Sequence, residues 1–223
     1  MVLLGAATAC SPVRPPSPSE PVAPPPAPAA VAPPPAASPD DLACLRHFRI
    51  DVWERRLRSQ RALRQATAAS LARGERHLPR VRAIVVAHGI PAGFALLPVV
   101  ESGFRLDARG RFGERGLWQL RRRTARRYGL VVDARRDERV HPDRSTEAAA
   151  RHLRHLHARY GEWPLALAAY NAGEGRVDRA LARAPHADFW QLAETGRLPR
   201  TSRDFVARFL ALVRVSENRP RCE

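Results

Sequence analysis

Residues Pro91-Ala-Gly-Phe-Ala-Leu-Leu-Pro-Val-Val-Glu101 combine an unbroken apolar run with a single carboxylate at its end. The proline that opens the run suits the first turn of a helix. Apolar side chains lie on every side of such a helix, which predicts that it is buried all round. Counting back from Glu101 by three, four and seven residues reaches Pro98, Leu97 and Phe94. The carboxylate therefore shares one helix face with three apolar side chains.

Helical periodicity extends on both sides of this run, and no segment shows the alternation that a strand requires. An arginine-rich helix and a second helix that ends near Gly89 precede it. Two longer helices follow it, and the last opens with Thr201-Ser-Arg-Asp204, a start typical of a capping box. The apolar stripes of these helices are Leu42, Leu45, Phe48, Val52 and Trp53; Leu78, Val81 and Val85; Ala149, Leu153, Leu156 and Tyr160; and Phe205, Phe209, Leu212 and Val213. The predicted fold class is all-α.

The chain is strongly basic. Its 223 residues include 38 basic side chains, all of them arginine, and 22 acidic ones, which gives a net charge of +16. No apolar run approaches the roughly 20 residues of a membrane-spanning helix, so an integral membrane protein is excluded. A field of this sign attracts polyanions, but no zipper, zinc module or RNA-binding signature accompanies the arginines at 121–123 and 126–127. We interpret the charge as a solvated surface and expect no nucleic-acid partner.

The N-terminal end has a composition of its own. Most of the 21 prolines precede Asp40, among alanine, serine and valine, which predicts a disordered, extended linker at residues 10–39. Residues 1–9 form a short apolar run before Cys10 and resemble the truncated end of a bacterial lipoprotein signal. On that interpretation Cys10 is acylated. The alternative is an ordinary disordered N-terminus with an incidental cysteine.

Three further regions are expected after the linker. Residues 40–77 are predicted to be an N-terminal helical extension, 78–216 the main globular domain and 217–223 a C-terminal tail. Cys44 and Cys222 stand near the two ends of the globular part. They are a candidate disulfide in an oxidising compartment, and two unrelated free thiols are the alternative.

Glu101 is the candidate catalytic residue. A carboxylate on an apolar helix is expected to lose solvation, which raises its pKa and allows it to donate a proton near neutral pH. The plain alternative is a glutamate at a helix end that turns into solvent or pairs with an arginine. The choice between the two depends on the segments that assemble around it.

Three segments stand at suggestive distances: Glu101-Ser-Gly-Phe104, Gly116-Leu-Trp-Gln119 and Ala168-Ala-Tyr-Asn-Ala-Gly173. Supporting matches are Ala95-Leu-Leu-Pro-Val-Val-Glu-Ser102, Arg127-Tyr-Gly-Leu130, Asp137-Glu-Arg139 and Leu198-Pro-Arg200. Together they resemble the soluble-lytic-transglycosylase-like catalytic domain, which is similar to goose-type lysozyme, and within it the membrane-bound lytic murein transglycosylase D type. The likeness covers about residues 78 to 213, and no LysM-type repeat follows it.

The resemblance implies a lysozyme-like helical globule with a substrate cleft. It implies an enzyme that cuts the β-1,4 bond between N-acetylmuramic acid and N-acetylglucosamine in peptidoglycan and leaves a 1,6-anhydro end. The family glutamate matched by Glu101 acts first as acid and then as base toward the sugar's own 6-hydroxyl, without a cofactor. A two-carboxylate hydrolase of lysozyme type would need a second acid, for which Asp107 and Glu114 are the nearest candidates. A non-catalytic glycan-binding or nucleic-acid-binding protein that keeps the fold is the remaining alternative.

The resemblance also assigns substrate-binding residues. Ser102 offers a hydroxyl beside the acid, and Gln119 can donate and accept at once, which suits an N-acetyl group. In the family the hydroxyl matched by Tyr170 lies near the acid, and the amide matched by Asn171 helps to bind the sugar. Trp118 is a groove wall or part of the core, and the core is favoured.

Two features bear on which ligands the protein binds. His152, His155 and His157 cluster on one helix, but no carboxylate or cysteine joins them at ligand spacing, so no metal is predicted. The segments Asp107-Ala-Arg-Gly-Arg-Phe-Gly-Glu-Arg115 and Arg121-Arg-Arg123 depart from the family pattern, which concerns the loop expected to contact substrate.

The expected setting follows from these assignments. The protein is predicted to be a periplasmic monomer, attached to the outer membrane of a Gram-negative bacterium through a lipid on Cys10. Its partners are then the membrane and the glycan strands of peptidoglycan.

Overall fold

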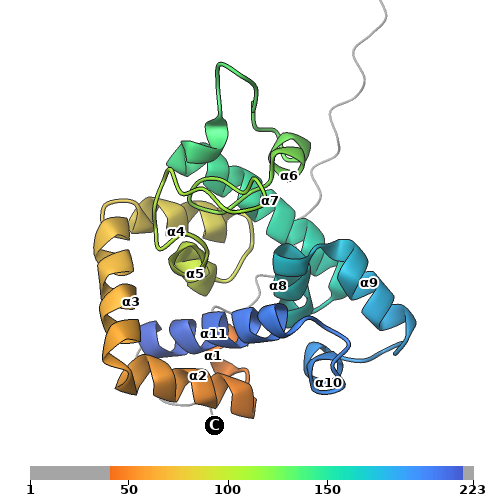
Figure 1. Cartoon of the computed structure of the whole chain (residues 1–223). Helices are drawn as coiled ribbons and strands as arrows, with labels where there is room; N and C mark the ends of the chain where they lie inside the picture. The colour runs from red at the N-terminus through yellow and green to blue at the C-terminus, as the bar shows by residue number, and fades with distance from the viewer. Residues whose placement is uncertain (1–40, 218–223) are drawn as a thin grey trace, which may run out of the picture. The chain divides into compact units, whose positions relative to one another are not determined.

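The computed structural model describes residues 41–217 (Figure 1). The predicted signal at residues 1–9, the linker at 10–39 with Cys10, and the distal cysteine Cys222 lie outside this range. The elements are α1 (Asp41–Cys44), α2 (Phe48–Ser59), α3 (Arg61–Gly74), α4 (Leu78–Ala87), η1 (Ala92–Leu96), α5 (Leu97–Glu101), α6 (Arg122–Arg127), η2 (Glu138–Val140), α7 (Pro142–Tyr160), α8 (Trp163–Ala172), α9 (Glu174–Ala182), α10 (Phe189–Glu194) and α11 (Arg200–Glu217). Between residues 41 and 217 there is no β-strand, only isolated bridges. The prediction of an all-α fold is confirmed. None of these helices combines the length and apolarity that crossing a bilayer requires.

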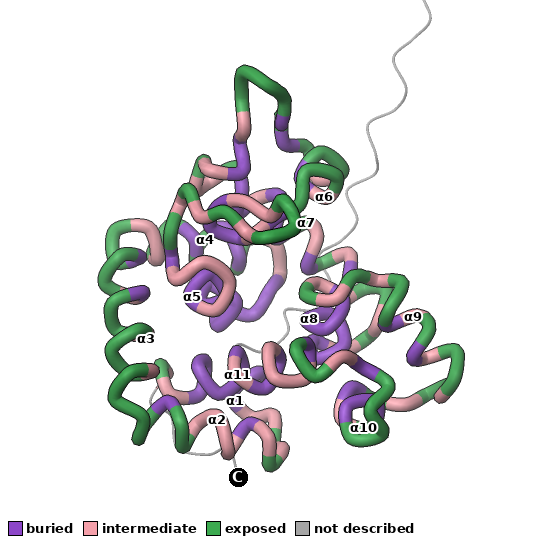
Figure 2. The backbone as a smooth tube through the Cα atoms, viewed as in Figure 1, coloured by how far each residue is buried: buried purple, intermediate pink, exposed green. Residues whose placement is uncertain are grey.

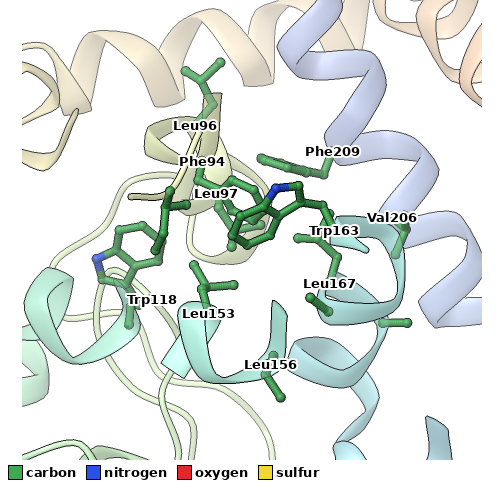
Figure 3. Packing of buried hydrophobic residues seen from close by; sticks show 14 of the residues in the cluster. Phe94, Leu96, Leu97, Trp118, Leu153, Leu156, Trp163, Leu167, Val206 and Phe209 are labelled. Atoms are coloured by element: carbon green, nitrogen blue, oxygen red, sulfur yellow. The ribbon is translucent and has the colours of Figure 1, made fainter. Parts of the chain in front are cut away.

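The core forms around α8, which α7 and α11 flank (Figure 2). This helix is buried from Trp163 through Ala169. The Phe94 ring lies 4.6 Å from the Trp163 ring and 5.3 Å from the Phe209 ring, measured between centroids. The apolar run therefore meets both α8 and α11 at the centre of the core (Figure 3). Every residue from 93 to 99 is buried, so the burial predicted for the run is confirmed.

The run is not one helix that begins at Pro91, and that prediction is wrong. Pro91 is extended at ψ 135°, η1 is a 3₁₀-helix, and α5 is a separate α-helix. Pro98 causes the break because it has no N–H to donate to the Phe94 carbonyl one turn back. That carbonyl accepts from the Leu97 N–H instead, which is the tighter 3₁₀ pattern. The short α5 then ends on Glu101.

The single stripe predicted from Leu42 to Trp53 is also wrong. The chain leaves the helix after Cys44 and starts α2 at Phe48, where the His47 side chain accepts a hydrogen bond from the Arg49 N–H at 3.2 Å. The break shifts the helical register, so Phe48 is 56% exposed while Ile50 and Leu57 of α2 are buried. Cys44 takes part in a disulfide bond, and its pairing with Cys222 stays a prediction.

The region predicted as an extension at residues 40–77 packs its α2 against α11. The buried Arg214 of α11 reaches Asp51 at 2.8 Å and Glu54 at 3.3 Å, and it also donates to the Leu45 carbonyl. The capping box expected at Thr201-Ser-Arg-Asp204 does not form, because α11 already begins at Arg200. These contacts join the extension to the same core as the main domain.

Candidate active site

Glu101 lies at the carboxyl end of α5 with its side chain partly buried. Within residues 41–217 its carboxylate has no hydrogen-bond or ion-pair partner. Burial raises the pKa of Glu101 to about 8, and the nearby charge of Glu114 adds to this effect. The carboxyl group is therefore protonated at neutral pH, which a general acid requires. No arginine between residues 41 and 217 is paired with it.

The turn after Glu101 explains the residues of this motif. The N–H groups of Ser102 and Phe104 both donate to the Pro98 carbonyl at 3.0 Å, which closes the helix. Phe104 adopts a left-handed φ of 61°, and its buried ring fills the space beside Gly74. A Cβ on Gly74 would lie 2.7 Å from that ring. The turn thus anchors the end of α5 on α3.

Ser102 joins the end of α5 to the next motif. Its hydroxyl donates to the Leu117 carbonyl at 2.8 Å and accepts from the Arg105 N–H at 3.2 Å. Because backbone groups engage the hydroxyl, its geometry supports a positioning role. Contact between Ser102 and substrate stays a prediction.

The motif Gly116-Leu-Trp-Gln119 meets this turn at the Leu117 carbonyl, which accepts the Ser102 hydroxyl. Leu117 and Trp118 are fully buried, and the indole N–H of Trp118 donates to Thr146 Oγ1 at 2.9 Å. The preference for Trp118 as a core residue is confirmed. Gln119 is half-buried with a left-handed φ of 47°. Its amide nitrogen donates to the Gly116 carbonyl at 2.8 Å and the Ala108 carbonyl at 3.3 Å, which leaves Oε1 as the acceptor.

Tyr170 and Asn171 lie in the last turn of α8, and their side chains form hydrogen bonds with two different neighbours. The Tyr170 hydroxyl donates to the Trp118 carbonyl at 2.7 Å. Burial raises the pKa of Tyr170 well above its usual value, and the charge of Glu101 raises it further, so the two side chains are close. Asn171 is exposed, and its Oδ1 accepts from Ser202 Oγ at 2.8 Å. The structure therefore brings Tyr170 to the acid and leaves Asn171 at the surface end of the helix.

A charged network supports the loop between the motifs. Arg139 is buried and donates from Nη1 to the Gly113 carbonyl at 2.8 Å and the Leu120 carbonyl at 3.0 Å. Its Nη2 lies 2.8 Å from Asp137, which also pairs with Arg115 at 3.2 Å. Asp137-Glu-Arg139 matches the family pattern, but its sequence alone assigns it no role. Its partners lie about twenty residues away along the chain, so local spacing carried no signal for them.

The two candidates for a second acid are poorly suited to the task. Burial pushes the pKa of Glu114 upward, but hydrogen bonds from the backbone, including the Phe112 N–H, and from Arg121 outweigh it and lower the pKa. Those from Phe112 and Arg121 measure 2.8 and 2.9 Å. Glu114 is thus held as a charged carboxylate. Asp107 is exposed.

The three histidines of α7 face separate partners. His152 lies between the rings of Tyr128 and Tyr170, at 4.9 and 5.2 Å. His155 faces Glu174 at 3.4 Å, and His157 stacks on a core tryptophan at 3.9 Å. Across the described part of the chain, no three His, Cys, Asp or Glu side chains are grouped to hold a metal ion. Burial also lowers the pKa of His152 to about 4, so it is neutral beside Tyr170.

Comparison with known proteins places this site in a family. Residues 87–193 match the transglycosylase SLT domain. The membrane-bound lytic murein transglycosylase D of Escherichia coli (strain K12) is 35% identical over 154 residues, which cover 67% of this chain and 33% of that protein. The peptidoglycan transglycosylase gp16 of Escherichia phage T7 is 36% identical over 100 residues, or 44% of this chain and 8% of that protein.

A solved structure agrees with these matches. The lytic transglycosylase Slt from Pseudomonas aeruginosa, as an inactive glutamate-to-glutamine variant, superposes with a TM-score of 0.51 and 25% identity, over 75% of this chain and 26% of that one. This chain spans about a third of the length of the murein transglycosylase it matches. The SLT match contains Glu101, Gln119, Tyr170 and Asn171. On this evidence the chain belongs to the soluble-lytic-transglycosylase-like family.

Proposed function

We propose that this chain is a lytic transglycosylase that acts on peptidoglycan. It cleaves the β-1,4 bond between N-acetylmuramic acid and N-acetylglucosamine and leaves a 1,6-anhydro end. The observation that carries the proposal is Glu101, a partly buried acid without a partner in residues 41–217, in the SLT domain. The relatives named as murein and peptidoglycan transglycosylases support the substrate. The Slt variant with glutamine for glutamate is inactive, which supports a catalytic glutamate.

One carboxyl group is sufficient for the proposed reaction. Glu101 donates its proton to the glycosidic oxygen, and the bond between that oxygen and C1 of the muramic acid breaks. The 6-hydroxyl oxygen of the same sugar then bonds to C1, while its proton passes to the Glu101 carboxylate. The acid form is restored and no water is consumed. The raised pKa of Glu101 suits both steps, because the group holds its proton at rest and is a competent base once it has lost it.

The neighbouring residues have distinct proposed tasks. The Tyr170 hydroxyl donates to the Trp118 carbonyl, and this bond holds the hydroxyl beside the acid. Gln119 presents Oε1 as an acceptor for the N–H of an N-acetyl group. Asn171 binds sugar at the exposed end of α8. Ser102 holds the end of α5 against the Leu117 carbonyl and so positions the acid.

The proposed setting is the bacterial envelope. A relative named as a membrane-bound murein transglycosylase supports this setting. Acylation of Cys10 would attach a monomer to the outer membrane, with the glycan strands as its partner. Mass spectrometry of the protein from its native host tests the anchor. An unmodified Cys10 with residues 1–9 still attached would contradict it.

The products of digestion test the proposed reaction. Purified sacculi treated with the protein should release muropeptides with 1,6-anhydro ends, each lighter by one water than the product of a hydrolase. Mass spectrometry of the soluble fraction separates the two. Reducing-end products would instead support a lysozyme-type hydrolase, and the absence of any release would leave only a binding protein.

The pH profile should report the state of Glu101. Because the acid form starts the reaction, kcat/KM is expected to fall as the pH rises through about 8. Replacing Glu114 with glutamine removes a negative charge that opposes ionisation of Glu101, so this alkaline limb should move to lower pH. Glu75→Gln, which removes an exposed carboxylate at the end of α3, is the matched control and should leave the limb in place. A profile without an alkaline limb would contradict the assigned acid.

A further inference from the structure

A pocket of about 420 Å³ lies beside the end of α5. Its walls come from α3, the end of α5 and α11, and Figure 1 shows α5 framed by the other two helices. Val100 and Ser102, the two neighbours of Glu101, both line it. Since consecutive Cα atoms are about 3.8 Å apart, the pocket begins one residue from the acid. Its α3 and α11 walls lie outside the residues 87–193 that match the SLT domain.

Three arginines from separate segments line this pocket: Arg73, Arg105 and Arg208. Within residues 41–217, none of them has a carboxylate within 4.0 Å. Arg73 is fixed by hydrogen bonds to the Gly103 carbonyl at 2.8 Å and Ser70 Oγ at 3.1 Å, both of them neutral partners. These bonds turn its guanidinium toward the pocket wall without compensating its charge.

Arg208 is the most deeply placed of the three. It is half-buried on α11, and its guanidinium lies 6.0 Å from the Trp53 ring centroid. Asp204, one turn earlier on α11, pairs with Arg200 at 3.7 Å instead. Burial lowers the pKa of Arg208, as it does for any cation that loses solvent. A partly desolvated cation without a counter-charge is unfavourable, and an anion in the pocket would relieve it.

The remaining wall limits what that anion can be. It is formed by small or apolar side chains such as Ala66, Ala69 and Val99, with a hydroxyl from Thr67. Guanidinium groups bind planar carboxylates through two parallel hydrogen bonds. The lining therefore suits a carboxylate carried on a small, largely apolar group. Peptidoglycan carries such groups on the peptide stems attached to its glycan strands.

We propose that this pocket binds a carboxylate of a peptide stem, next to the glycosidic bond that Glu101 protonates. The proposal rests on the function proposed above, since it places the stem of the same substrate. Arg105 and Arg208 make the charged contacts, and Arg73 is held in place beside them. Substrate strands that bear stems are therefore bound more tightly than strands from which the stems have been removed.

The test compares two substrates. Glycan strands of equal length are prepared with their stems intact or stripped by an amidase. The lactyl carboxylate that the amidase exposes on each muramic acid is converted to a neutral amide, and kcat/KM is measured on both kinds of strand. Arg105→Gln and Arg208→Gln should each lower kcat/KM on stem-bearing strands about tenfold, mainly through KM, as the loss of a charge-assisted hydrogen bond does. Cleavage of stripped strands should not change. Arg154→Gln on α7 removes an exposed charge outside the pocket, as a match for Arg105, and should affect neither substrate.

The other outcomes either contradict the stem-binding pocket or show whether the pocket or the proposed function has failed. Equal losses on both substrates would mean that the arginines serve the sugar or the fold, and unchanged cleavage of stem-bearing strands would mean that the pocket takes no stem. Inorganic phosphate at matched ionic strength, if it inhibits both substrates equally, would identify a free-anion site.

If the wild type cleaves neither substrate, the proposed function fails. The pocket assignment is then tested by measuring how tightly the two kinds of strand bind. Sedimentation of the two kinds of strand with the Glu101→Gln protein then gives their affinities. In that background Arg105→Gln and Arg208→Gln should weaken the binding of stem-bearing strands alone. Equal binding of both kinds of strand by all variants would overturn the pocket assignment.

Discussion

The Glu101→Gln variant is expected to release anhydro-muropeptides about a thousandfold more slowly than the wild type, within the range for loss of a general acid. Glutamine has nearly the same shape but can neither donate a proton to the glycosidic oxygen nor accept one from the 6-hydroxyl. The measurement is the initial rate of product release from sacculi, followed by chromatography with mass detection. Because both proposed steps use this one group, no residual pathway through a second carboxylate is expected.

Two controls separate this effect from a folding defect. Asp107→Asn removes an exposed carboxylate six residues later and should keep wild-type activity. The Glu101→Gln protein should unfold at a higher temperature than the wild type when both are measured at pH 9. The sign follows from linkage: the pKa of Glu101 is raised from 4.5 to about 8 on folding, so the wild type loses stability as the pH rises between these values. Normal activity in the Glu101 variant would overturn the mechanism.

The environment of Glu101 could be predicted from the sequence because helical periodicity places Leu97 and Pro98, one turn earlier, on its face. That argument needs only local spacing, and it gave both the burial and the direction of the pKa change. The division of the run into η1 and α5 was missed, although Pro98 contained the signal. Because Pro98 has no N–H, the preceding turn is a tighter 3₁₀ turn. This break determines where α5 begins and therefore where Glu101 lies at its end.

The parts of the site that were not predictable depend on pairings between distant segments. Ser102 and Gln119 were expected to face substrate, yet their donor groups are engaged by backbone carbonyls that no periodicity identifies. Arg139 reaches the Gly113 carbonyl across 26 residues. The pocket beside α5 combines Arg105 with Arg208, whose proximity exists only after α11 has packed. In a chain with 38 basic residues, such an arginine has no distinctive sequence signal.

The loop that carries Gln119 depends on a close approach at Gly116. Gly116 has a φ of +80°, and a Cβ there would lie 1.9 Å from the Arg139 carbonyl oxygen. That oxygen belongs to the backbone of η2, whose Arg139 side chain is held by Asp137 and the Gly113 carbonyl. Neither the Gly116 backbone nor the Arg139 carbonyl can move to relieve this overlap without a large energetic cost. Glycine is therefore required both for its conformation and for the space.

Gly116→Ala is expected to lower the free energy of unfolding by at least about 4 kcal/mol, which puts it among the most damaging single substitutions. Gly113→Ala is the matched control, because its φ of +84° is equally left-handed while nothing lies within 4 Å of the added Cβ. It should cost only about 1–2 kcal/mol, the price of the backbone conformation alone. Urea denaturation of the three proteins measures both values. If the two substitutions cost the same, the contact between Gly116 and the Arg139 carbonyl does not constrain the loop.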